Sequence, residues 1–378
     1  MNDCRELSAK EADDARALFL RAFGHEARQD WWHWKYRGKG LLDSIHWGAF
    51  DASGKLFGHV GALALRADRR YLLDSPSVLV QVCDVMVSPQ HRGWDRLGFV
   101  YRRMMESFAQ EIARRWPGSL AFGFPGERPH RLGERLGFYS GIDRYAICKD
   151  MSFDIHRSHR LSPQFSGRLC TWDEALPHID RWAEKALLGS FRLRSAHPDQ
   201  GPTVLRDSRY LTWRYRDHPL HQYGIWLLHR HDLWRIPVVG WLVSRESAQG
   251  PPVLVDGWVK GFGMLTQALA SFKVVRHNRS NEPEANGAQR ATEAQGISLG
   301  AGSDLPLASL RWQLWLPQEG IDPTVSVVAT RFNHPSQWQG SVCQSTARSN
   351  YDKVGAVGIE ASRTNGRMFF TAGDTDVW

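Results

Sequence analysis

The sequence predicts an α/β fold made of two tandem units, each a mixed, mostly antiparallel sheet flanked by helices. In the first half of the 378-residue chain, segments with helical spacing of apolar residues alternate with strand-like segments. In the second half several of these segments return in the same order, as expected after a tandem duplication. We therefore expect one domain over residues 1–152 and a second, more divergent domain over residues 165–378.

The first half begins with an amphipathic helix. Ser8 and Glu11 have the spacing of a capping box, and apolar residues recur at helical spacing until Gly24. Two strands follow around a turn at 51–54, and the nearly continuous apolar run 78–87 is typical of a central strand. The remaining elements expected in this unit are a helix over 97–116, a strand over 119–124, a short helix over 128–138 and a strand over 145–153.

Three pairs of segments carry the internal repeat. Trp34-Lys-Tyr-Arg37 returns as Trp213-Arg-Tyr-Arg216, and Cys83-Asp-Val-Met-Val87 returns as Val255-Asp-Gly-Trp-Val259. Between them, LFGHVGALALR (56–66) is matched by IPVVGWLVSRE (236–246). Any two α/β units share strand–turn–strand patterns, so the aromatic–basic cluster is the more specific signal. The polar, aperiodic stretch 275–308 interrupts the second unit, and we expect it to be a disordered surface loop.

The composition narrows the class of protein. No apolar run approaches the length of a membrane span, and the first residues lack the apolar core of a secretory signal. The five cysteines are scattered and form no C-x-x-C pair, which argues against a zinc site or a disulfide framework. We therefore expect a cytoplasmic protein without a metal. The net charge of +8 suits an anionic partner, but the arginines are spread along the chain, which disfavours nucleic acid.

The segment that joins the central strand to the next helix, VSPQHRGWDRLGF (87–99), has the chemistry of a phosphate-binding turn. The N-terminus of a helix presents unpaired backbone N–H groups and partial positive charge. A glycine lets the backbone approach a phosphate closely. Arg92 and Gly93 fit this use, and we expect a pyrophosphate to bind here.

The segment 85–105 (VMVSPQHRGWDRLGFVYRRMM) resembles the acyl-CoA-binding motif of the GNAT N-acyltransferases, V-x-P-x-x-[RQ]-G-x-G-x-[GA]. The segment 122–138 (FGFPGERPHRLGERLGF) resembles the strand and helix that follow in that family. The resemblance covers residues 1 to about 150, and the second half resembles a divergent copy, as in tandem GNAT proteins. It implies transfer of an acyl group from acetyl-CoA or another acyl-CoA to an amine by direct attack, without a metal.

The resemblance also implies where the acyl-CoA binds. The backbone around Val85 and Val87 would pair with the pantetheine, in a slot where the central strand separates from the strand over 119–124. The N–H groups of the turn would face the pyrophosphate, and the residues expected there are Arg92, Gly93, Trp94, Asp95, Arg96, Leu97 and Gly98. Asp95 and Leu97 stand where the family has small residues, and a shifted turn that uses Gly98 would restore the amides.

Three residues are candidates for proton transfer. Asp84 is the candidate base, because a carboxylate in an apolar strand is desolvated and its pKa is raised. Its counterpart Asp256 leaves a second interpretation open, a structural hydrogen bond common to both units. The tyrosine that serves as general acid in the family aligns with Gly133, so Tyr139 and Tyr145 are the candidate substitutes, with packing as the alternative role.

Aromatic residues of the repeated cluster are candidates to line an acceptor cleft between the units, with a core role as the alternative. These candidates are Trp32, Trp34, Tyr36 and Trp213. The expected acceptor is the primary amine of a small molecule, an amino sugar or a peptide, and the 17 tryptophans favour a sugar-like compound. Two other functions remain open: a GNAT-fold binding or scaffold protein that has lost turnover, and an aminoacyl-tRNA-dependent transferase.

Overall fold

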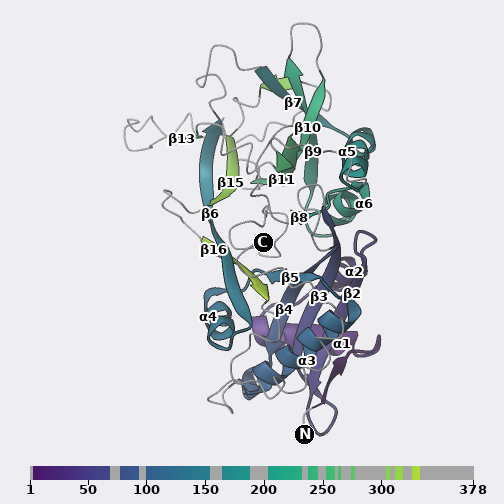
Figure 1. The fold of residues 1–378 in the computed structure, drawn as a ribbon, viewed down its shortest axis with the longest axis vertical. Helices are drawn as coiled ribbons and strands as arrows, with labels where there is room; N and C mark the ends of the chain where they lie inside the picture. The colour runs from purple at the N-terminus through teal and green to yellow at the C-terminus, as the bar shows by residue number, and fades with distance from the viewer. Residues whose placement is uncertain are drawn as a thin grey trace, which may run out of the picture.

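The computed structural model shows a long mixed sheet with helices on its faces (Figure 1). It describes residues 3–68, 77–92, 99–153, 164–187, 203–231, 237–245, 253–259, 263–264, 274–276, 304–306, 311–317 and 326–332. Most of the stretch expected to be a surface loop, 277–303, and the last residues, 333–378, lie outside the described residues. None of the helices in the described parts combines the length and the apolar character needed to cross a membrane.

Among the described residues, five strands form the sheet of the first unit and four helices cover it. In spatial order the strands are β1 (Asp3–Glu6), β2 (Asp43–Phe50), β3 (Leu56–Asp68), β4 (Val78–Val87) and β5 (Leu120–Gly123). Neighbouring strands are antiparallel except β4 and β5, which are parallel. The helices are α1 (Ala12–Phe23), α2 (Gln29–Arg37), α3 (Phe99–Arg115) and α4 (Glu127–Arg135).

The sheet of the first unit separates two apolar clusters, because successive side chains of a strand point to opposite faces. On β3, Leu63 belongs to the cluster beneath α1 and α2, which also contains Leu18. The adjacent Ala62 belongs to the cluster beneath α3 and α4, which also contains Phe108. A sheet buried on both faces explains why β3 and β4 read as nearly continuous apolar runs.

Most of the elements predicted for the first unit are confirmed, but one helix was missed. The segment 30–40, for which the sequence predicts no regular element, forms most of helix α2. Trp32, Lys35 and Tyr36 lie on its buried face at the i, i+3 and i+4 spacing of a helix. Burial of this face against the sheet outweighs the moderate helix propensity of the aromatic residues.

In the described residues the second half begins, like the first, with a strand and a helix and continues, after a short strand, with a helical segment and three strands. Its main elements are β7 (Gln164–Cys170), α5 (Trp172–Leu187), β8 (Thr203–Val204), α6 (Ser208–Leu211), η2 (Thr212–Arg216), β9 (Tyr223–His231), β10 (Val238–Arg245), β11 (Val253–Val259) and β15 (Arg311–Pro317). Strands β7, β9, β10 and β11 are antiparallel, and β11 then pairs in parallel with β15. Short strands complete the described part: β12 (Gly263–Met264), β13 (Val274–Arg276) and β14 (Asp304–Pro306).

The two halves exchange strands. Strand β6 (Tyr139–Phe153) follows β5 in the chain, yet it pairs with β15 of the second half. Strand β16 (Ser326–Phe332) follows β15, yet it pairs with β5 of the first half. Because β6 and β16 also pair with each other, the spatial order β5-β16-β6-β15 joins both halves in one sheet. Figure 1 shows β6 running from the lower, N-terminal part of the molecule into the upper part.

Candidate active site

The backbone pairing between β4 and β5, the two central strands of the first unit, ends before β4 does. β4 and β5 pair from Leu79 and Leu120 to Val82 and Gly123, which is the last pair between them in the described residues. β4 continues to Val87. The backbones are close at the last pair, because a Cβ on Gly123 would lie 3.0 Å from the carbonyl oxygen of Val82. We call the end of this ladder the fork.

A β-bulge lies directly beyond the fork. Two residues of β4, Asp84 and Val85, stand opposite the single residue Val60 of β3. Asp84 has a φ of +47°, in the left-handed region that residues other than glycine rarely adopt. Such a conformation persists only where the surrounding structure holds it in place.

Two residues of α2 hold the carboxylate of Asp84. The Nζ atom of Lys35 lies 3.0 Å from Oδ1 and 2.9 Å from Oδ2, and the Tyr36 hydroxyl donates to Oδ2 at 2.5 Å. The Lys35 side chain is completely buried, so this ion pair is made away from water. Gly61 is required beneath it, because a Cβ at that position would lie 2.0 Å from the Tyr36 hydroxyl oxygen. The bulge is therefore anchored to α2.

Asp256 of the second half has matching contacts. The hydroxyl of Tyr215, the counterpart of Tyr36 in the repeated cluster, donates to Asp256 at 2.7 Å. The Nε atom of Arg206 lies 2.9 Å from both carboxylate oxygens. The same tyrosine–aspartate bond in both halves favours the structural interpretation of Asp84. Its use as a base remains a proposal.

Two histidines, His46 on β2 and His59 on β3, lie beneath the bulge. The Nδ1 atom of His59 lies 3.0 Å from the carbonyl oxygen of Asp84, and its Nε2 atom lies 3.1 Å from Nδ1 of His46. Burial is the main reason why the pKa of both rings is lowered, and the pKa of His46 falls to about 2. Lys35 and Arg37 of α2 add to this effect at His46, whereas Asp84 partly offsets it at His59. Both rings are neutral at physiological pH.

The neutral histidines predict that the protein loses stability in acid. Below pH 6.5 an unfolded His46 binds a proton, whereas the folded residue does so only near pH 2. The unfolded state then binds more protons, so the free energy of unfolding falls as the pH drops below 6.5, by up to about 1.4 kcal/mol per pH unit for each such histidine. Urea unfolding at pH 8 and pH 5 measures the loss. His46→Gln removes one titrating group and should flatten the slope; an unchanged slope would contradict this assignment.

The candidate acids differ in what surrounds them. Tyr139 is buried, and its hydroxyl oxygen lies 2.8 Å from that of Tyr101. A Cβ on Gly133 would lie 2.0 Å from the Tyr139 ring, so this ring occupies the space that a side chain at 133 would need. Burial raises the pKa of Tyr139 well above its usual value and that of Tyr101 to about 12, so both phenols keep their protons at neutral pH. Tyr145 lies further along β6, opposite Val327 of β16.

The turn expected to bind pyrophosphate is described only at its start. Residues Pro89–His91 form a short 3-10 turn after β4. The Arg92 guanidinium donates to the carbonyl oxygen of Val87 at 2.8 Å and to that of Ala22 at 3.2 Å, which ties the turn to the end of α1. The other expected phosphate-facing residues, Gly93, Trp94, Asp95, Arg96, Leu97 and Gly98, lie outside the described residues.

Three of the aromatic residues expected to line an acceptor cleft are buried instead. The exposed fractions of Trp32, Tyr36 and Trp213 are 2%, 3% and 3%, so none offers a ring face to an incoming molecule. The structure contradicts an acceptor-lining role for these residues and supports the core role. Trp34 and Trp213 instead join the two halves: the Trp34 indole N–H donates to the Trp213 carbonyl oxygen at 2.5 Å, and the Trp213 indole N–H donates to the Trp34 carbonyl oxygen at 2.7 Å.

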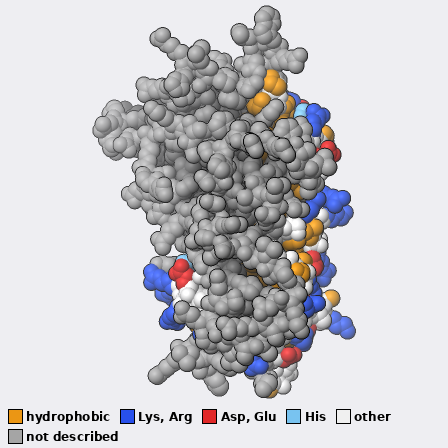
Figure 2. Space-filling model, viewed as in Figure 1, with side chains coloured by type: hydrophobic (Ala, Val, Ile, Leu, Met, Phe, Trp, Pro, Cys, Tyr) orange, Lys and Arg blue, Asp and Glu red, His pale blue; other side chains and the backbone are white. Residues whose placement is uncertain are grey.

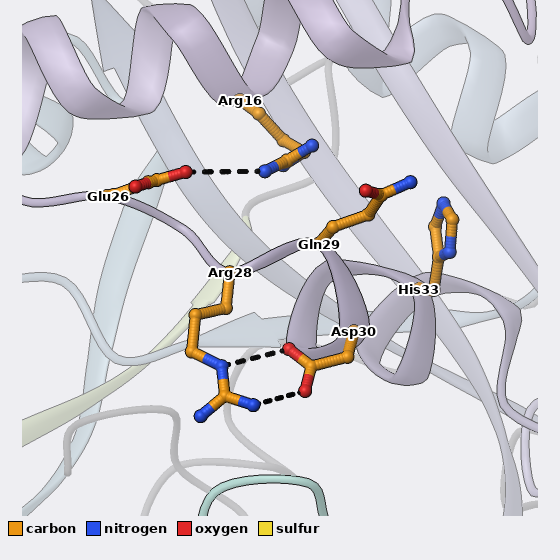
Figure 3. A pocket seen from close by; sticks show the side chains of 6 residues that line it. All are labelled: Arg16, Glu26, Arg28, Gln29, Asp30 and His33. Atoms are coloured by element: carbon orange, nitrogen blue, oxygen red, sulfur yellow. Dashed lines mark hydrogen bonds and ion pairs between the residues drawn. The ribbon is translucent and has the colours of Figure 1, made fainter.

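A polar pocket of about 600 Å³ lies on the surface of α1 and the first turn of α2 (Figure 3). Its lining residues are Arg16, Glu26, Arg28, Gln29, Asp30 and His33. The four charged side chains pair with one another: Arg16 lies 3.6 Å from Glu26, and Arg28 pairs with Asp30. The pocket presents balanced charge, and we assign it no ligand.

Basic side chains of the described residues do not form one continuous patch on the face shown in Figure 2. The exposed arginines of α4, Arg128, Arg131 and Arg135, are accompanied by the exposed Glu134. Within the described ranges, no group of three or more His, Cys, Asp and Glu side chains has the arrangement of a metal site.

Asp84 is a candidate from the sequence alone, but its partners are not: Tyr36 was expected to line an acceptor cleft, and Lys35 was given no role. Lys35 is part of the repeated cluster, although nothing in its spacing shows that it is buried. His46, His59 and Gly61 carry no motif. They lie on β2 and β3, and their roles appear only when these strands are placed next to β4.

Comparisons with known proteins show what the first part of the chain is similar to. Residues 3–140 match the family model of the acetyltransferase (GNAT) domain. Similar solved structures include a probable N-acyltransferase from Enterococcus faecalis (TM-score 0.51) and a GCN5-related N-acetyltransferase from Anabaena variabilis (TM-score 0.52). Each is 12% identical, and each alignment covers 88% of this chain and 72% of the other, so the likeness shows a shared fold. No match was found among curated proteins.

Proposed function

Because residues 3–140 match the family model of the GNAT acetyltransferase domain, we propose that this protein is an N-acyltransferase that moves an acyl group from acetyl-CoA or another acyl-CoA to a primary amine. The observation that carries the proposal is the fork. β4 continues to Val87 after its last pair with β5 at Val82, so a length of strand edge faces away from β3 at the bulge. The amide groups of a pantetheine chain can pair with such an edge as a further strand would.

The reaction needs orientation of the two reactants, stabilisation of the oxyanion and removal of a proton from the amine. In this proposal the backbone around Val85 and Val87 positions the thioester. Asp84 first serves as the anchor of the bulge, and its use as the base requires that its carboxylate leave Lys35 or take the proton while paired with it. Tyr139, protonated and bonded to Tyr101, is the proposed proton donor. The acceptor is a small-molecule amine, an amino sugar or a peptide.

We also propose that the chain is a tandem duplication, with a first domain over 1–152 and a second over 165–378. The exchanged strands and the reciprocal bonds between Trp34 and Trp213 support it, because a contact in which each partner makes the same bond to the other is expected of an approximate two-fold relation. In this proposal the second unit completes the sheet of the first. Asp256 in its core is 1% exposed and paired with Arg206, which suits a structural role.

Binding of acetyl-CoA tests the proposed function. A ligand that binds only the folded state raises the melting temperature, and at about 100 times its Kd it adds about 2.7 kcal/mol to the free energy of unfolding. We expect this shift for the full-length chain with acetyl-CoA, and a smaller one with ADP, which has the pyrophosphate but no pantetheine. No shift with acetyl-CoA or longer acyl-CoAs at millimolar concentration would rule out the proposal. Where binding is found, acetyl-CoA consumption with each class of amine identifies the acceptor.

One observation favours a second candidate, a GNAT-fold protein that binds acyl-CoA without turnover. The candidate base, Asp84, is already held by Lys35 and Tyr36. The position that aligns with the general-acid tyrosine of the family is occupied by Gly133. Binding of acetyl-CoA with no consumption by any amine class would favour this candidate over the enzyme.

A further inference from the structure

We infer that His59, backed by His46, is a positioning residue that orients the peptide group between Asp84 and Val85 so that the Val85 N–H faces the fork. The inference rests on the proposed function, since it concerns the backbone expected to meet an acyl-CoA. It assigns the two histidines a role distinct from that of the Asp84 side chain, which α2 holds independently.

When both rings are neutral, the hydrogen bonds determine which of the facing nitrogens donates and which accepts. The carbonyl oxygen of Asp84 can only accept, so His59 must carry its proton on Nδ1. In a neutral ring the Nε2 atom of His59 is then an acceptor, and the Nδ1 atom of His46 must be the donor. A second proton on His59 would reverse the bond between the rings, because Nε2 of His59 would then donate and Nδ1 of His46 would have to accept. The pair therefore forms a directed chain of hydrogen bonds that ends on the Asp84 carbonyl.

The direction of this carbonyl determines the direction of the next amide. A trans peptide group is planar, so the carbonyl of Asp84 and the N–H of Val85 point in opposite directions. His59 is on β3, and β3 and β5 lie on opposite sides of β4. A carbonyl drawn towards His59 therefore turns the Val85 N–H towards the side of β4 where the ladder with β5 has ended.

The surroundings of the pair keep it rigid. The His46 ring packs against the Tyr36 ring with centroids 3.9 Å apart and stacks on Trp32 at 5.6 Å. His59 is completely buried. The Val85 N–H is thereby held in a fixed direction before the substrate arrives. Such a donor stabilises a developing negative charge without the free-energy cost of turning the donor towards that charge.

Calorimetric titration of the full-length chain with acetyl-CoA and with CoA tests the inference, because only acetyl-CoA has the thioester carbonyl that the Val85 N–H would meet. We expect His59→Leu to weaken acetyl-CoA binding about 3- to 10-fold more than CoA binding, the range of one hydrogen bond. His59→Asn, whose side-chain amide can donate to the Asp84 carbonyl, should restore most of the difference. Equal weakening of both ligands would overturn the inference and leave a general structural role for His59.

Nitrogen NMR of the wild-type histidines gives a readout that needs no variant. We expect both His46 and His59 to be neutral with the proton on Nδ1 from pH 8 to pH 6. Protonation of His59 on Nε2 alone would overturn the inference whatever the chain binds. Failure of the wild type to bind acetyl-CoA and CoA would instead overturn the proposed function, so the two failures are distinguishable.

Discussion

Replacing Lys35 with methionine is expected to lower the free energy of unfolding by about 3–5 kcal/mol, the usual cost of leaving one charge of a buried ion pair without its partner. The Lys35 side chain is completely buried, and its ammonium group lies within 3.0 Å of both oxygens of Asp84. Methionine has a similar volume, so the loss would come from the carboxylate rather than from a cavity. Urea unfolding at pH 7 measures it.

The double variant Lys35→Met/Asp84→Asn is the control. Asparagine has no charge, still accepts a bond from Tyr36 and tolerates the φ of +47° at this position, so the double variant should recover most of the lost stability. If Lys35→Met is as stable as the wild type, the ion pair does not anchor the bulge.

The single variant Asp84→Asn also tests the base: unchanged kcat with intact acyl-CoA binding would remove Asp84 from that role.

Replacing Trp213 with alanine is expected to destabilise both halves of the chain together, by about 3–5 kcal/mol. The indole is 3% exposed and lies directly over the first half, where a Cβ on Gly38 would be 1.9 Å from the ring. Because the two halves share one sheet, we expect a single unfolding transition that shifts as a whole. Thermal unfolding followed by fluorescence and by circular dichroism measures the shift.

The matched control is Trp213→Phe, which keeps an aromatic ring over Gly38 and Gly40 but loses the bond to the Trp34 carbonyl. It should cost less than the alanine variant. A double-mutant cycle with Trp34→Ala should show coupling, since the two residues bond to each other in both directions. Two separate transitions, with only one of them shifted by Trp213→Ala, would contradict a joint core.

Most elements of the first unit could be predicted because their signals are local. The apolar spacing over 12–23 repeats every turn of one helix, and the glycine that ends it, Gly24, has the positive φ of a helix C-cap. Gly54, in the turn expected at 51–54, and Gly118, which follows α3, also have a positive φ. Helix α2 was missed because its aromatic residues have no strong local preference, and only burial against the sheet makes it a helix.

The candidate site also has features that are local in the sequence and features that depend on the assembled sheet. By itself the sequence determined that the first unit has a GNAT-like strand, turn and helix, and that Asp84 is a carboxylate in an apolar strand. Only the tertiary structure decided that the Asp84 carboxylate is held by Lys35, 49 residues away. The same is true of the bond between the Asp84 backbone carbonyl and His59, 25 residues away. The tertiary structure also decided that Trp213 belongs to a core shared by both halves. The physical reason is that the periodicity of apolar residues shows which face of a helix or strand is buried. It does not show which residue packs against that face. That residue, with the charge or conformation it imposes, comes from strands and helices that meet only when the sheet is assembled.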